Sequence, residues 1–167
     1  PRARVTPRGW SGGGGGVLSG PPVDYHPSME IVQMDDHGAL FLSPAIDDWA
    51  EIDRLGITAV FDLDEGLDAG VPDVPGGILY IYFHFSDEGL PDMRRLRGLA
   101  DLGAYLCRSG HRVLVHCTMG LNRSALLTGK ILYRMGMKGP DVVRRLQSRR
   151  AGALYNEVYA EYLQELD

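Results

Sequence analysis

The sequence predicts an α/β fold in which a central, mostly parallel sheet carries helices on both faces. Several short, nearly continuous apolar runs are typical of strands that are buried on both sides. Between them lie segments with apolar residues at three- and four-residue spacing, which indicates helices that bury one face. After residue 123 only helical patterns follow. Since parallel neighbours need a crossover connection, this alternation favours a parallel sheet covered by helices.

The first half of the chain is expected to supply most of the strands. Strands are predicted at 30–34, 39–42, 57–63 and 78–83, and a helix is predicted at 46–55. Turn residues at 35–38 join the first two strands, and Gly56 ends the helix. Residues 64–77, rich in Gly, Pro and Asp, form a loop. The runs 57–63 and 78–83 are almost wholly apolar, so both strands are expected to be buried.

The second half of the chain is expected to be mainly helical. A strand is predicted at 112–115, and helices are predicted at 92–109, 124–135, 140–149 and 155–166. The helix at 124–135 is apolar nearly all round, which predicts a central position in the fold. Ligands of open α/β sheets bind at the carboxyl ends of the strands. The segment 116–123 follows a strand and lies at such an end.

Composition and charge restrict the partners. A chain of 167 residues with 44% hydrophobic and 23% charged residues suits one globular domain. No stretch approaches about 18 consecutive apolar residues, so no membrane partner is expected. Residues 1–22 hold a glycine run, three arginines and no acid, which predicts a flexible basic tail before a domain at 23–167. Because the chain carries −5 and the tail +3, the domain carries −8, which argues against nucleic acid.

The cysteine and histidine content predicts neither disulfides nor a metal. Two cysteines, Cys107 and Cys117, are too few for a disulfide framework, so a reducing, cytoplasmic setting is expected. Cys107 lies on the apolar stripe of the 92–109 helix and is expected in the core. The five histidines are scattered, and no Cys/His cluster has the spacing of zinc ligands. The sequence therefore indicates no cofactor.

The segment after the 112–115 strand combines a nucleophile with an anion site. It reads His116-Cys117-Thr118-Met119-Gly120-Leu121-Asn122-Arg123-Ser124 and runs into a helix. A loop of this kind turns successive N–H groups inward, and the helix adds its N-terminal partial positive charge. Gly120 permits a positive φ, and the planar fork of Arg123 suits two phosphate oxygens. The same field favours thiolate over thiol at Cys117, so the loop supplies its own nucleophile.

These residues resemble the signature loop of the cysteine-dependent protein tyrosine phosphatases. The His-Cys, five residues, Arg-Ser pattern after a buried strand carries the resemblance, and the chain length is similar to the compact dual-specificity branch. The likeness covers roughly residues 30–165. It implies that residues 23–167 form a catalytic domain that hydrolyses phosphate monoesters. It further implies a cysteinyl-phosphate intermediate and no cofactor.

The resemblance implies a role for each loop residue. Cys117 attacks phosphorus, and Ser124 helps the thiolate leave in the second step. His116 orients the cysteine and is not the base. Phosphate oxygens are held by Arg123 and by the amides of Thr118, Met119, Gly120, Leu121 and Asn122.

The general acid implied by the resemblance is Asp87. It follows the 78–83 strand in a Phe-Ser-Asp context similar to the acid loop of the family. Glu88 and Asp92 lie nearby, and Asp92 is typical of a helix cap. Asn156 resembles an asparagine that supports the active-site loop. Asp62 and Asp64 end a strand and receive no role.

The expected partner is a phosphorylated protein or peptide, with phosphotyrosine as the first substrate. A domain this short lacks insertions that deepen the pocket, so phosphoserine and phosphothreonine are further candidates. The sequence leaves the oligomeric state open. Localisation is expected to be cytoplasmic.

Other activities of the same fold remain alternatives. The loop also resembles that of RNA 5′-triphosphatases, but Met119 and the Ser124-Ala125 pair depart from it, and the acidic domain disfavours RNA. Phosphoinositide phosphatases tend to carry basic residues at 118–122, where this chain has none. An inactive phosphopeptide-binding module is disfavoured because Cys117 and Arg123 are both present. A sulfurtransferase would need a different loop length. An arsenate reductase would need further redox cysteines in addition to Cys107.

Overall fold

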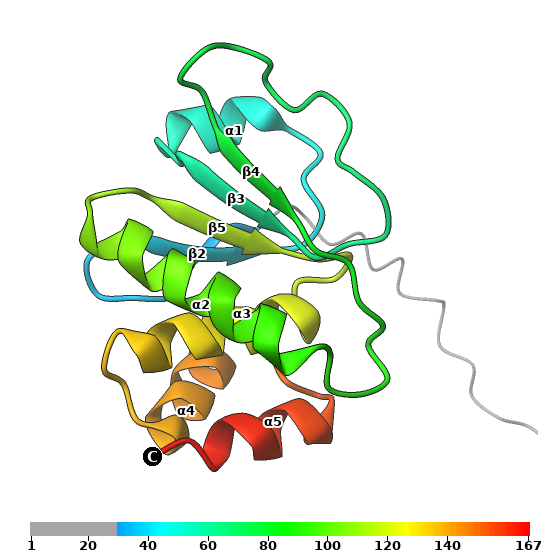
Figure 1. The fold of residues 1–167 in the computed structure, drawn as a ribbon, viewed down its shortest axis with the longest axis vertical. Helices are drawn as coiled ribbons and strands as arrows, with labels where there is room; N and C mark the ends of the chain where they lie inside the picture. Colours follow the sequence, from blue (N-terminus) through cyan, green and yellow to red (C-terminus); the bar gives the residue numbers. More distant parts are fainter. Residues whose placement is uncertain (1–29) are drawn as a thin grey trace, which may run out of the picture.

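The computed structural model describes residues 30–167, and the predicted tail at 1–22 lies outside them. Figure 1 shows a sheet with a helix on one side and the remaining helices on the other. The strands are β1 (Val32–Gln33), β2 (Leu40–Ser43), β3 (Ala59–Asp62), β4 (Leu79–Tyr82) and β5 (Val113–His116). The helices are α1 (Trp49–Arg54), α2 (Met93–Arg108), α3 (Arg123–Arg134), α4 (Gly139–Arg149) and α5 (Glu157–Gln164).

The sheet order is β1-β2-β5-β3-β4, with β1 antiparallel and the other pairs parallel. The predicted mostly parallel sheet is therefore confirmed. β5 lies in the middle, where His116 is in register with Ser43 of β2 and with Asp62 of β3. The segment that follows His116 consequently leaves the sheet at the centre of its carboxyl edge.

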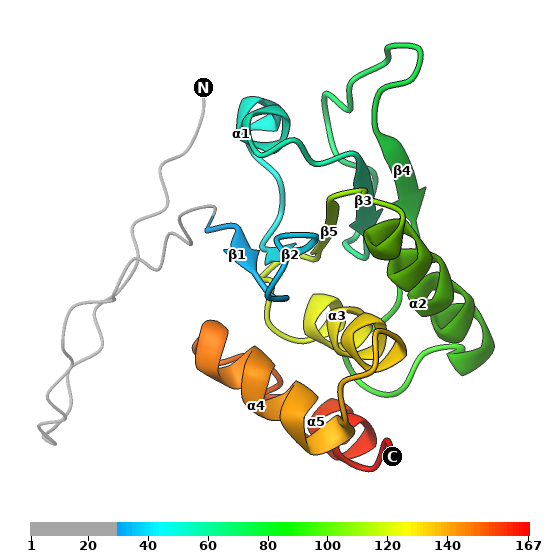
Figure 2. The same ribbon diagram turned by 90° about the vertical axis from the view of Figure 1, so that its left-hand side faces the viewer.

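The two faces of the sheet are covered by separate cores. Phe41, Val60 and Leu114 pack with Ile52 and Ile57 around α1 on one face. Alternate positions of the same strands face α2 and α3 in the larger core, and α4 and α5 pack against α3. Figure 2 shows the strands between α1 and the α2–α3 pair. Because successive strand side chains point to opposite faces, apolar residues throughout a strand require cover on both sides.

Helix α3 is central, as its apolar pattern predicts. Every residue from Arg123 to Leu132 is buried. A Cβ on Gly129 would lie 2.6 Å from a methyl group of Leu163, so α3 and the α5 end of the fold are in close contact there. Within the described residues, no helix is both long and apolar enough to cross a membrane.

Strand β4 differs from the sequence expectation. The 78–83 run was expected to be buried, yet Leu79 and Tyr82 are 46% and 41% exposed. β4 pairs only with β3 and is an edge strand, so part of its apolar surface faces solvent. The prediction of a fully buried strand was wrong, because strand order is not contained in a local apolar pattern.

Candidate active site

The cysteine loop joins β5 to α3. Cys117 follows the last residue of β5 and is 2% exposed, while Ser124 lies in the first turn of α3 and is fully buried. The Cys117 Sγ and Ser124 Oγ atoms are 3.2 Å apart, within hydrogen-bond reach. A serine hydroxyl in this position can donate to a thiolate, which is the chemistry that the second step of a phosphocysteine mechanism needs.

Gly120 is required where the cysteine loop passes the end of β2. Its φ is +64°, in the left-handed region. A Cβ there would lie 2.5 Å from the carbonyl carbon and oxygen of Ser43 and 2.6 Å from the nitrogen of Pro44. The neighbouring Thr118 carbonyl accepts a hydrogen bond from the Ala45 N–H at 3.3 Å. Any larger residue at 120 would push the loop away from the sheet.

Three consecutive loop carbonyls are held by the segment after α4. Buried Arg150 donates from Nε to the Gly120 oxygen at 2.7 Å and from Nη2 to the Met119 oxygen at 3.1 Å. The Leu154 N–H donates to the Leu121 oxygen at 2.8 Å. In a trans peptide the C=O and the next N–H point in opposite directions. The N–H groups of residues 120 and 121 are therefore directed away from Arg150, and that of Asn122 away from the Leu154 N–H, as an anion nest requires.

The sequence did not predict a role for Arg150. This residue comes 27 positions after Arg123 and is one of several arginines at 144–150, so no local pattern distinguishes it. Only its burial to 7% exposure and its bonds to the loop identify it as a positioning residue.

Arg123 is oriented by the end of β3. Its Nη1 donates to the Leu63 oxygen at 2.9 Å, and its Nη2 donates to Thr118 Oγ1 at 2.7 Å. Asp64 Oδ1 lies 3.6 Å from the same Nη2 and accepts a hydrogen bond from Thr118 Oγ1. Asp64, which received no role from the sequence, thus lies at the candidate phosphate clamp. An arriving phosphate would compete with Thr118 and Asp64 for this nitrogen.

Asp87 is linked directly to the cysteine loop. Its Oδ2 accepts a hydrogen bond from Asn122 Nδ2 at 2.8 Å. Asn156 Nδ2 donates to the Asp87 backbone oxygen at 2.9 Å, and the Asn156 N–H donates to Asn122 Oδ1 at 3.0 Å. These three residues come from the loop after β4, the cysteine loop and the N-cap of α5. The structure therefore brings together two residues expected at the site and the predicted support, Asn156.

The two competing carboxylates have other surroundings. Asp92 is the N-cap of α2 and accepts from the Arg94 and Arg95 N–H groups at 3.0 and 3.2 Å. Glu88 is exposed. Among residues 30–167, Asp87 is the carboxylate of these three whose hydrogen bonds reach the cysteine loop.

Tyr159 anchors the loop that carries Asp87. The side chain is fully buried, and its hydroxyl lies 3.1 Å from the Ser86 oxygen and 3.0 Å from the Gly89 oxygen, to one of which it donates at a time. Burial, reinforced by the nearby Asp87 carboxylate, raises the pKa of Tyr159 to about 12. The phenol therefore remains a donor at neutral pH. The contact with the loop gives this core residue a positioning role.

His116 lies beneath the cysteine loop, and its side chain is fully buried. It is the last residue of β5, one residue beyond the predicted end of that strand, and it immediately precedes Cys117. Its imidazole faces the carboxylates of Asp62 and Asp68 on the side of β3.

Cys107 is expected to resist alkylation in the folded protein. It is 7% exposed and its thiol donates to the Ala39 oxygen at 3.5 Å. Burial, with a further contribution from Asp35, raises the pKa of Cys107 to about 12, so the thiol stays protonated at neutral pH. Peptide mass spectrometry after iodoacetamide treatment should find Cys107 unmodified in buffer and modified in urea. Rapid labelling in buffer would contradict its place in the core.

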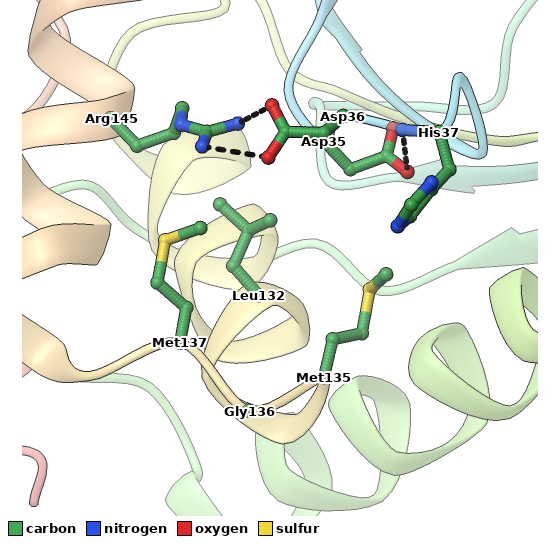
Figure 3. Close-up of a pocket in the computed structure, with 8 residues that line it drawn as sticks. All are labelled: Asp35, Asp36, His37, Leu132, Met135, Gly136, Met137 and Arg145. Atoms are coloured by element: carbon green, nitrogen blue, oxygen red, sulfur yellow. Dashed lines mark hydrogen bonds and ion pairs between the residues drawn. The ribbon is translucent and has the colours of Figure 1, made fainter.

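A separate pocket of about 300 Å³ lies at the other end of α3 (Figure 3). It is lined by Asp35, Asp36, His37, Leu132, Met135, Gly136, Met137 and Arg145. Arg145 forms a two-bond ion pair with Asp36, at 2.8 and 3.1 Å. A helix of 12 residues is about 18 Å long, so this pocket is remote from Arg123 at the start of α3. It is not part of the candidate active site.

The comparisons with known proteins agree with this geometry. No protein-family model matches the chain. Human protein tyrosine phosphatase type IVA 3 is 29% identical over 117 residues, which is 69% of this chain and 67% of that protein. Dual specificity protein phosphatase 26 of Bos taurus is 25% identical over 174 residues, covering 91% of this chain and 82% of that protein.

Solved structures show the same fold. Human DUSP28 superimposes with a TM-score of 0.68 at 22% identity, covering 81% of this chain and 90% of that one. Human tyrosine phosphatase-like serine/threonine/tyrosine-interacting protein superimposes with a TM-score of 0.67 at 23% identity. The match covers 83% of this chain and 95% of that one. These solved structures show that the chain has the dual-specificity phosphatase fold, and its similarity to the two phosphatase relatives supports a phosphatase-type hydrolase.

Proposed function

We propose that the protein hydrolyses phosphate monoesters on proteins, phosphotyrosine first, through a phosphocysteine formed on Cys117. The observation that carries the proposal is the hydrogen bond between Asp87 and Asn122, which joins the acid loop to the cysteine loop. It supports a site in which a nucleophile and a general acid flank one phosphate group. The phosphatase relatives support the reaction class, and they imply phosphoprotein substrates.

The proposed first step transfers the phosphoryl group to sulfur. The Cys117 thiolate attacks phosphorus, the P–S bond forms and the P–O bond to the leaving group breaks. The leaving oxygen takes its proton from Asp87. Arg123 and the N–H groups of residues 120–122 stabilise charge on the other three phosphate oxygens, because these donors are already oriented before the reaction.

The second step returns the enzyme to its starting state. Asp87, now a carboxylate, removes a proton from water while the water oxygen attacks phosphorus. The P–S bond breaks, inorganic phosphate leaves and sulfur departs as thiolate. The Ser124 hydroxyl, 3.2 Å from Sγ, stabilises the departing thiolate by a hydrogen bond.

Asp87→Asn is expected to slow esters with poor leaving groups by about 10²- to 10⁴-fold. Esters of acidic phenols should lose far less, since they leave without a proton. Turnover is measured across aryl phosphates of increasing leaving-group pKa, with Glu88→Gln as the matched change at the next position. Equal losses across the series would assign the acid elsewhere.

The surroundings of the site support a protein substrate over a polyanion. The exposed apolar side chains of Leu90, Met119, Tyr155 and Val158 belong to the segments that form the site. They suit an aromatic or peptide group beside the phosphate. Asp64, next to Arg123, adds negative charge that disfavours multiply phosphorylated ligands.

Two other substrate classes are the alternatives. PTPMT1, whose solved structure holds PI(5)P, shares the fold at a TM-score of 0.67 and 16% identity. The absence of basic residues at 118–122 disfavours such a lipid headgroup here. An RNA 5′-triphosphate is disfavoured for the same reason and by the acidic domain.

The test is phosphate release, with a chelator present, from matched phosphotyrosine, phosphoserine and phosphothreonine peptides, PI(5)P and a 5′-triphosphorylated RNA. The highest kcat/KM is expected for the phosphotyrosine peptide, and basic flanks should raise it. A higher value for the lipid or the RNA would overturn the substrate assignment. Binding of phosphopeptide without turnover of any compound would favour the binding-module alternative.

A further inference from the structure

A buried polar cluster lies behind the cysteine loop, on the side away from the proposed phosphate position. It consists of Asp62, at the end of β3, His116, at the end of β5, Asp68 in the following loop and Tyr80 in β4. The side chains of Asp62 and His116 are fully buried, and that of Asp68 is 8% exposed. Asp62 and His116 are register partners on adjacent strands, so the sheet itself brings them together.

The imidazole of His116 lacks a hydrogen-bond partner. Its Nε2 lies 2.9 Å from Asp68 Oδ2 and 3.6 Å from Asp62 Oδ1. Neither contact has hydrogen-bond geometry, and both ring nitrogens are unpartnered within the described part of the chain. An imidazole in the interior normally has a partner for at least one nitrogen. The Nε2 side of the ring instead lies close to the carboxylate oxygens of Asp62 and Asp68.

Tyr80 satisfies the carboxylates only in part. Its hydroxyl contacts Asp62 Oδ2 and lies 3.1 Å from Asp68 Oδ2. A phenol has one proton and donates to one of them at a time. Asp62 Oδ1 also accepts from the Asp64 N–H at 2.8 Å. Among residues 30–167, Asp68 Oδ2 is thus without a hydrogen-bond donor whenever Tyr80 donates to Asp62.

The cluster is short of positive charge. Two carboxylates carry a formal −2, whereas one imidazole contributes at most +1. A buried charge without a counter-charge is strongly unfavourable. A divalent cation bound by both carboxylates and a neutral imidazole would bring the formal charge to zero.

The donor atoms have the spacing of a zinc site. The ligand atoms of Asp62, Asp68 and His116 all lie within 4.8 Å of one another. With Zn–N and Zn–O bonds of about 2.0–2.1 Å, tetrahedral ligands are about 3.3 Å apart. The distances of 2.9 and 3.6 Å from Nε2 bracket that value. Imidazole nitrogen with carboxylate oxygen suits Zn²⁺ better than Mg²⁺, which prefers six oxygens.

We propose that Asp62, Asp68 and His116 bind Zn²⁺, with Tyr80 orienting the two carboxylates. The ion takes no part in the phosphocysteine chemistry. It fixes the His116 ring and the end of β5 directly beneath Cys117, so it stabilises the base of the loop. The three ligands lie at 62, 68 and 116, a spacing that no local zinc motif has, which is why the sequence indicated no metal.

The test measures zinc binding to the Cys117→Ser variant, because this change removes a rival thiolate ligand. The metal-free protein is titrated with Zn²⁺ in competition with a chromophoric chelator. One equivalent is expected to bind and to raise the melting temperature. Adding Asp68→Asn should weaken binding by roughly 10- to 100-fold or more. Asp73→Asn, an exposed change in the same loop, should leave it unaltered.

Two further readouts keep the proposal falsifiable if Asp68→Asn is unstable. Circular dichroism reports whether each variant is folded. Co²⁺ titrated into the Cys117→Ser protein should give the intense visible absorption of a tetrahedral site. Equal zinc affinity in folded Asp68→Asn and Asp73→Asn would overturn the assignment, as would weak absorption typical of six-coordinate Co²⁺.

Discussion

Cys117→Ser is expected to lower kcat on aryl phosphates by on the order of 10⁴-fold or more, the scale of losing a covalent nucleophile. A hydroxyl at 117 would remain protonated at neutral pH. The polar contact of the Cys117 side chain is the Ser124 hydroxyl at 3.2 Å, which is not a base that could activate it. The measurement is steady-state hydrolysis with a chelator present, followed to high enzyme concentration.

The matched control for Cys117→Ser is binding. The nest held by Arg150 and Leu154 does not depend on the sulfur, so a phosphotyrosine peptide should still bind with an affinity close to the wild-type KM. Isothermal titration calorimetry measures this, and an unchanged melting temperature shows an intact fold. Turnover by the serine protein above background would remove Cys117 from the nucleophile role.

Arg123→Lys is the second change with a large expected effect. We expect kcat/KM to fall by roughly 10²- to 10³-fold although the charge is kept. The arginine fork is oriented by its bonds to the Leu63 oxygen and Thr118 Oγ1, at 2.9 and 2.7 Å. A lysine ammonium is a point charge on a flexible stem and cannot offer two parallel N–H bonds to phosphate. Steady-state kinetics with an aryl phosphate measures the loss.

The control for Arg123→Lys separates the clamp from stability. Arg123 is only 9% exposed, and losing its hydrogen bonds costs about 1–3 kcal/mol of folding free energy. Kinetics are therefore compared well below the melting temperature of the variant. Arg94→Lys, at an exposed position of α2, should leave both activity and stability unaltered. A near-wild-type rate for Arg123→Lys would show that phosphate is held by other groups.

The sequence by itself determined the layered α/β fold and the composition of the cysteine loop. Both follow from local patterns. The run 112–115 and the helix from residue 124 are recognisable by their apolar residues, and the loop between them has eight residues, from His116 to Arg123. The family resemblance implied that Ser124 acts on the Cys117 thiolate, and the structure places the two side chains 3.2 Å apart.

Only the tertiary structure decided how distant residues contact this loop. Asp87 and Asn156 were expected at the site from the family resemblance, but their hydrogen bonds with Asn122 are visible only in the structure. The hydrogen bonds from Arg150 to the loop carbonyls were not predicted. The position of β4 at the sheet edge and the approach of Asp64 to Arg123 were not predicted either. Such contacts depend on strand order, register and helix packing, which no local pattern encodes. Hydrophobic periodicity indicates which face of a helix or strand is buried. Which other element packs against that face depends on how all the elements pack together.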